Sequence, residues 1–221
     1  HPAKNSEKPI RPYRQTVPSA RELELTPKVL IVSELSIPQC AKYRVWQRKE
    51  ELELLGWDVE VVNWHDPQSA LSAMQTSWEV IFYRTPAASV IQTLIEEAKR
   101  FGIEPWWEVD DLIFDLELYG QNSNLLSLDK AEQESLLEGA QLYRDCLQLC
   151  GRGIASTRVL GELMSRAGVK DVCIIENAFD AETLRIADLL LAQGKAVREN
   201  DNIVIVYGSG TRTHDQDFVE L

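Results

Sequence analysis

The stretch KVLIVSELSIPQCAKYRVWQRKEELELLGWDVEVVNW (28–64) decides the fold class of this chain. It opens with an apolar run at 28–33, continues with apolar residues at helical spacing, and closes with a second apolar run at 58–64. Gly56 stands just before the second run, at a position typical of a helix end. Strand, helix and strand in this order predict a βαβ unit of a parallel sheet.

The same alternation continues along the rest of the chain. Further strands are expected at 78–84, 105–110, 153–156, 172–177 and 202–208. Helices are expected between them, at 87–101, 131–150 and 181–194. Because most of the strands are apolar throughout, they are typical of a sheet covered on both faces. The sequence therefore predicts an α/β protein with a doubly wound, mainly parallel, Rossmann-like sheet.

Composition divides the chain into four parts. Five of the nine prolines fall within 1–27, which we interpret as a proline-rich arm or linker. Residues 28–180 are expected to form one Rossmann-like domain, and 181–201 a connecting helix and linker. Residues 202–221 resemble the first strand, loop and helix of a truncated second Rossmann-like domain. The chain begins with His1 and stops within an amphipathic segment, so we expect a piece of a longer polypeptide.

Charge and cysteine content narrow the class of partner. With 23 Lys and Arg against 35 Asp and Glu, the net charge is −12, which opposes bulk binding to nucleic acid or to an anionic membrane. No apolar run approaches the roughly 18 residues that span a bilayer, so no integral membrane segment is expected. The 4 cysteines lack zinc-site spacing. We expect a cytoplasmic protein without a structural metal or disulfide framework.

Ligands of open parallel sheets bind beyond the carboxyl ends of the strands. Arg84 directly follows an apolar strand, where a guanidinium requires a carboxylate partner or an anionic ligand, and both readings are open. Asp110 and Asp111 follow the next strand. We expect one of them to cap the following turn and the other to face the crevice as an acceptor for sugar hydroxyls. A hard-metal site there is the weaker alternative.

Three more polar residues lie near predicted strand ends. Tyr43 and Arg44 fall in the first turns of the first helix. Asn177 ends the sixth predicted strand, where it either caps the next helix or lines the crevice. Thr157, with Ser156, precedes a helical pattern and is expected to be an N-cap.

The segment YGSGTRTHDQDF (207–218) joins a glycine-containing loop to a predicted helix start. Free backbone N–H groups and the helix dipole at such a start attract anions. The spacing is neither the dinucleotide-binding nor the Walker pattern, so a phosphate site and a capped tight turn are both open readings. The candidate phosphate-binding residues are Gly208, Ser209, Gly210, Thr211, Arg212 and His214.

Four local motifs resemble one family. They are YRVWQ (43–47), EVDDLIFD (108–115), the pair AST (155–157) and ENAFD (176–180), and YGSGTRTHDQDF (207–218). In these the chain resembles bacterial glycosyltransferases of the two-Rossmann-domain (GT-B) kind, in the family 4-like group linked to O-antigen and other surface polysaccharides. The resemblance covers the first domain and the start of the second.

This resemblance implies transfer of a sugar from a nucleotide-sugar donor to a glycan or lipid-linked acceptor, with retention at the anomeric carbon. It implies no metal and no cofactor besides the substrates, and a peripheral position at the inner face of the cell membrane. Asp110 and Asp111 would be catalytic, and loop 208–214 would bind the donor diphosphate. Acceptor binding would fall to Tyr43, Arg44, Arg84 and Asn177. A non-catalytic flavodoxin-like binding or scaffold domain of a larger protein is the alternative.

Overall fold

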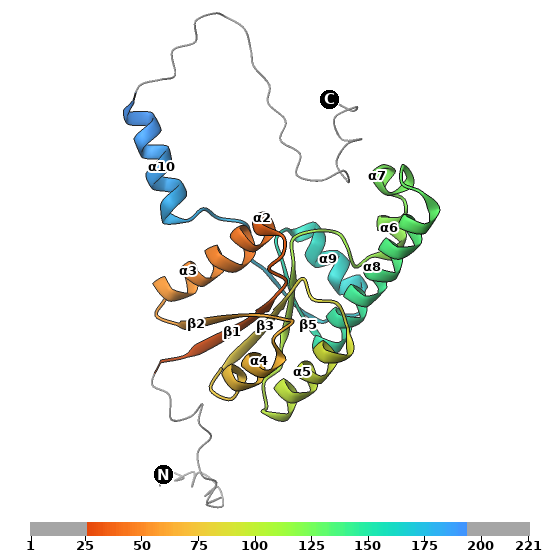
Figure 1. The fold of residues 1–221 in the computed structure, drawn as a ribbon, viewed down its shortest axis with the longest axis horizontal. Coiled ribbons are helices and arrows are strands. Elements are labelled where there is room, and N and C mark those ends of the chain that lie inside the picture. Colours follow the sequence, from red (N-terminus) through yellow and green to blue (C-terminus); the bar gives the residue numbers. More distant parts are fainter. Residues whose placement is uncertain (1–25, 194–221) are drawn as a thin grey trace, which may run out of the picture.

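The computed structural model describes residues 26–193, which form a six-stranded, all-parallel sheet with helices packed against it (Figure 1). The strand order is β2-β1-β3-β4-β5-β6. The strands are β1 (Lys28–Ser33), β2 (Asp58–Asn63), β3 (Glu79–Tyr83), β4 (Trp106–Val109), β5 (Arg152–Ala155) and β6 (Asp171–Ile174). The predicted α/β class with a doubly wound, Rossmann-like sheet is confirmed. The predicted arm, 1–27, and the predicted second domain, 202–221, lie outside the described residues except for positions 26 and 27.

Alternation along the strands divides the apolar side chains between two cores. Leu30 and Val32 of β1 pack with α4 (Pro67–Met74), α5 (Ser89–Arg100), α8 (Lys130–Cys150) and α9 (Arg158–Arg166) in the larger core. Val29 and Ile31 point to the other face, where they pack against residues of α2 (Pro38–Ala41) and the helix that follows it. The β1 run is thus apolar at every position because both of its faces are covered.

The first helical segment changes its winding partway along. Between α2 and α3 (Gln47–Leu54), the residues Lys42–Trp46 form a π-helix, η1, in which Gln47 N donates to Lys42 O. Such π-helical turns are rare and are found frequently at functional sites. This turn directs Val45 and Arg44 inward, and both are almost completely buried.

Short polar side chains cap the N-termini of the helices that connect the strands. Thr157 accepts a hydrogen bond from Leu160 N, so its predicted role as the N-cap of α9 is confirmed. Asp129 caps α8 in the same way. Gly56 follows α3 with a φ of 86°, a conformation that favours glycine, as expected for a residue that ends a helix. Two short helices, α6 (Leu116–Gly120) and α7 (Ser123–Leu126), lie between β4 and α8.

The helix α10 (Ala181–Ala192) stands off the layered body (Figure 1). All of its residues are exposed, although five of them are Leu or Ile: Leu184, Ile186, Leu189, Leu190 and Leu191. Its first turn is held by polar contacts, because Asp180 caps it and the Glu50 carboxylate accepts from Ala181 N at 3.0 Å. Within residues 26–193, no helix is long and apolar enough to cross a membrane.

Candidate functional site

The carboxyl ends of three neighbouring strands meet at one edge of the sheet. Ser33 of β1 pairs with Tyr83 of β3, and Tyr83 pairs with Glu108 of β4. The ladder continues past the strand ends, because Arg84 N donates to Glu108 O at 3.0 Å. Residues that follow these strands are therefore brought side by side, as the crevice rule for open sheets requires.

Arg84 occupies the centre of this edge in a strained conformation. Its φ is 52°, and among residues 26–193 it is the only non-glycine residue with a positive φ. Left-handed backbone of this kind costs a non-glycine residue about 1–2 kcal/mol and is concentrated at functional sites. Its guanidinium pairs with Asp111 and lies 3.8 Å from an oxygen of Asp110. Of the two open readings for Arg84, a carboxylate partner and an anionic ligand, the structure shows the first.

The two aspartates differ in environment. Asp110 is mostly buried and accepts a hydrogen bond from the Tyr83 hydroxyl at 2.9 Å, whereas half of the Asp111 side chain is exposed. Burial, together with the neighbouring charge of Asp111, raises the pKa of Asp110. Burial opposes the charge of Arg84 as well, but Asp111 outweighs this effect and raises the pKa of Arg84.

The expectation that one of the two aspartates caps the next turn is wrong. The cap of α6 is Asp115, whose carboxylate accepts from Leu118 N at 3.1 Å. Both Asp110 and Asp111 instead bind side chains of the neighbouring strand end, at Tyr83 and Arg84. Their oxygens are thus held at the crevice edge by side-chain contacts across the sheet.

Aromatic side chains flank the same edge. Tyr119 of α6 and Tyr143 of α8 are half-buried; burial raises the pKa of each, while the nearby charge of Arg84 acts in the opposite direction. After β1, the Glu34 carboxylate accepts from Trp64 Nε1 at 2.8 Å and from Ser36 N at 2.7 Å. Burial alone would raise the pKa of Glu34, but these hydrogen bonds outweigh it and lower the pKa.

Arg44 does not present its guanidinium to solvent. Its Nη2 pairs with the buried carboxylate of Glu108, and its Nη1 donates to Ile175 O and to Asn177 Oδ1, each at 2.9 Å. In this structure, therefore, Arg44 fixes the chain after β6, and Asn177 serves as its acceptor. Tyr43, the third of these predicted acceptor-binding residues, is half exposed on η1.

The pair of Arg44 and Glu108 belongs to a larger buried polar cluster. Arg48 Nη2 lies 3.4 Å from the same Glu108 oxygen, and Arg48 also pairs with Glu51 at the surface. Several buried polar atoms of this cluster have no hydrogen-bond partner, among them Glu108 Oε2, Arg48 Nε and Gln47 Oε1. Sequence reasoning missed Glu108, although a single carboxylate within the apolar run WWEV was a usable signal.

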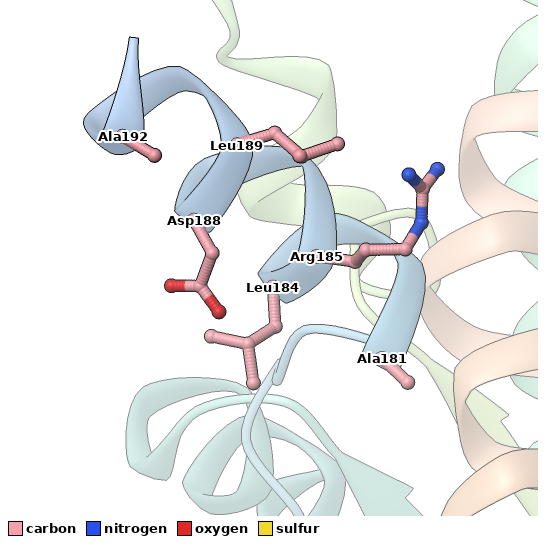
Figure 2. A pocket seen from close by; sticks show the side chains of 6 residues that line it. All are labelled: Ala181, Leu184, Arg185, Asp188, Leu189 and Ala192. Carbon is pink, nitrogen blue, oxygen red and sulfur yellow. The ribbon is translucent and has the colours of Figure 1, made fainter. Parts of the chain in front are cut away.

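Three further observations concern the donor loop, the helix α10 and metal binding. The candidate donor loop (208–214) lies outside the described residues. Figure 2 shows a groove on α10 whose described lining residues all belong to that helix: Ala181, Leu184, Arg185, Asp188, Leu189 and Ala192. Within residues 26–193, no second element contributes to this groove. In the described part of the chain, no three His, Cys, Asp or Glu side chains are grouped to hold a metal ion.

Comparison with known proteins adds no family assignment. No protein-family model matches the chain, and no curated protein matches it.

Proposed function

We propose that this chain is the acceptor-binding part of a glycosyltransferase. The enzyme would move a sugar from a nucleotide-sugar donor to a glycan or lipid-linked acceptor, with retention at the anomeric carbon, in the synthesis of cell-surface polysaccharide at the cytoplasmic face of the membrane. The proposal combines the chemistry of the strand-end crevice with the resemblance of four sequence motifs to family 4-like enzymes.

One observation supports it most strongly. Arg84 is held in left-handed backbone at the carboxyl end of β3, between Asp110 and Asp111. Strained backbone conformations are concentrated at binding and active sites. A strand can end without a strained arginine, so the end of β3 does not by itself account for this conformation. Carboxylates accept hydrogen bonds from hydroxyl groups. Tyr119 and Tyr143 lie within electrostatic range of Arg84.

The residues divide the work of acceptor binding. Asp111, which is half exposed, would accept a hydrogen bond from the acceptor hydroxyl. Arg84, which also lies 3.8 Å from Asp110, would fix the position of Asp111. Holding the acceptor hydroxyl next to the anomeric carbon turns a bimolecular reaction into an effectively unimolecular one. Most of the acceleration of sugar transfer would therefore come from positioning. Charge on the departing diphosphate would be stabilised by backbone N–H donors and Arg212 of the candidate donor loop.

Transfer is tested with a longer polypeptide that carries this chain and the residues that follow it. Release of nucleoside diphosphate from a panel of nucleotide-sugars is measured with a lipid-linked acceptor fraction. Asp111→Asn and Asp110→Asn should each lower turnover by at least about tenfold, while thermal melting stays within a few degrees. Asp129→Asn is the matched control, because Asn caps α8 as well as Asp does.

The control should leave both turnover and melting unchanged. Full turnover in both crevice variants would remove these two residues from the proposed machinery. If the longer polypeptide releases no nucleoside diphosphate from any donor, and the 221-residue chain binds no saccharide, the scaffold alternative takes precedence.

A further inference from the structure

The charges at the strand-end crevice are unbalanced. Three carboxylates, those of Glu34, Asp110 and Asp111, follow β1 and β4, whereas Arg84 is the one cation that pairs with any of them in the described chain. Glu34 accepts hydrogen bonds from two neutral donors, the indole of Trp64 and the N–H of Ser36, and interacts electrostatically with the imidazole of His65. The set therefore carries more negative than positive charge when its carboxyl groups are ionised.

The one cation of this set is already occupied. The Arg84 side chain is 15% exposed, while the Asp111 side chain that pairs with it is 49% exposed. A ligand that enters from solvent thus meets the carboxylate more readily than the guanidinium. Without Asp111, the nearest acidic oxygen to Arg84 would be that of Asp110, at 3.8 Å.

These contacts select among saccharides by charge. A hydroxyl group donates a hydrogen bond to a carboxylate oxygen, and three carboxylates provide several such acceptors. A carboxylate or phosphate on the ligand has no proton to donate and would be repelled by the same oxygens. An anionic ligand could gain an ion pair with Arg84 only by displacing Asp111.

We propose that the crevice binds an uncharged, hydroxyl-rich saccharide end and rejects acidic ones, and that Asp111 sets this selectivity by covering the charge of Arg84. This inference rests on the proposed function, since it names the class of acceptor that the site takes. It adds a specificity role for Asp111 that acceptor binding alone does not require.

The test uses the 221-residue chain and an immobilised panel of matched saccharides. Each neutral hexose end is paired with the hexuronate of the same stereochemistry: glucose with glucuronate, galactose with galacturonate, and mannose with mannuronate. The readout is the ratio of neutral to acidic binding within each pair. We expect the unmodified chain to prefer the neutral member by about tenfold or more.

Asp111→Asn should reduce this ratio by about tenfold, because it exposes Arg84 to the uronate. Glu117→Gln is the matched control: it removes one negative charge from an exposed position of α6 and should leave the ratio unchanged. Asp111→Ser serves as a second variant if Asp111→Asn folds poorly. The binding ratio of a variant is interpreted when its Tm is close to that of the unmodified chain.

The outcomes separate the two proposals. A preference of the unmodified chain for uronates, or an unchanged ratio in the Asp111 variants, overturns the charge selectivity while acceptor binding stands. An equal fall of the ratio in Glu117→Gln would assign the effect to net charge and overturn the role of Asp111. If no saccharide of either kind binds any variant, acceptor binding fails and the inference fails with it.

Discussion

Replacing Glu108 by Gln should be the most destabilising single polar substitution of the described chain. The Glu108 side chain is 1% exposed and pairs with Arg44, whose side chain is fully buried, while Arg48 approaches the same oxygen at 3.4 Å. The neutral amide of the Glu108→Gln variant would leave the Arg44 charge buried without a counter-ion. Breaking a buried pair in this way costs about 3–5 kcal/mol. For a domain of this size, that loss lowers Tm by roughly 6–20 °C.

The measurement is urea unfolding and thermal melting at pH 7, followed by circular dichroism. Glu51→Gln is the matched control: it removes the other carboxylate that pairs with Arg48, but at a partly exposed position, so it should cost less than about 1 kcal/mol. Replacing Arg44 and Glu108 together by Met should recover part of the loss, because the Arg44 charge is then removed along with its partner and Arg48 keeps its pair with Glu51. If Glu108→Gln costs no more than Glu51→Gln, the reasoning about the buried pair is refuted.

Three further predictions concern the strand-end crevice and the start of α10. In urea unfolding, the Arg84→Gly variant should be more stable than the Arg84→Ala variant by about 1 kcal/mol, because only glycine adopts a φ of 52° without strain. Equal stability of the two variants would show that the backbone at this position is not strained. Folding raises the pKa of Asp110, so ionisation of its carboxyl group destabilises the folded state, and stability is lost as pH rises through the raised pKa. The Asp110→Asn variant should therefore melt no lower than the unmodified chain at pH 7. A clearly lower Tm of the variant would show that the ionised carboxylate stabilises the fold. Hydrogen bonds from Thr183 and Gln47 lower the pKa of Asp180 to about 2. The contribution of Asp180 to folding stability is therefore complete above its ordinary pKa near 4 and is lost as pH falls toward 2. NMR titration of the carboxyl group should show a midpoint near 2, and a midpoint near 4 would refute the capping contact.

The sheet could be predicted from sequence because its strands are local, contiguous apolar runs. Every predicted strand within the described residues is present; the bounds of β1 agree with 28–33, and those of the other strands differ by up to three residues, as with 172–177 against Asp171–Ile174 for β6. The helix α4 was not predicted, since its sequence is short and mixed, although Asp66 and Pro67 are a usable start signal. The long helix α8 was predicted almost to the residue from its apolar spacing.

The candidate site could be predicted only in part. Position after a strand was enough to select Arg84, Asp110 and Asp111, because parallel strands bring their carboxyl ends together. The partners of Arg44 could not be found in this way, since Ile175 lies 131 positions further along the chain and η1 is needed to turn Arg44 inward. The cap at Asp115 was missed because two adjacent aspartates nearby offered the same chemistry.

The π-helical turn η1 also makes this segment sensitive to chain length. The i→i+5 turn of η1 holds one residue more than an i→i+4 turn, so deleting one residue between Lys42 and Trp46 would let the segment close as an ordinary α-helix. Inserting one residue there would instead rotate α2 relative to α3 by about 100°, the angle by which each residue of an α-helix advances. Cys40 and Ala41 would then turn away from the apolar cluster that they now join, and the chain could keep either this contact or the pairing of Arg44 with Glu108. Substitutions at the exposed η1 positions Lys42, Tyr43 and Trp46 should accordingly be tolerated far more often than insertions there.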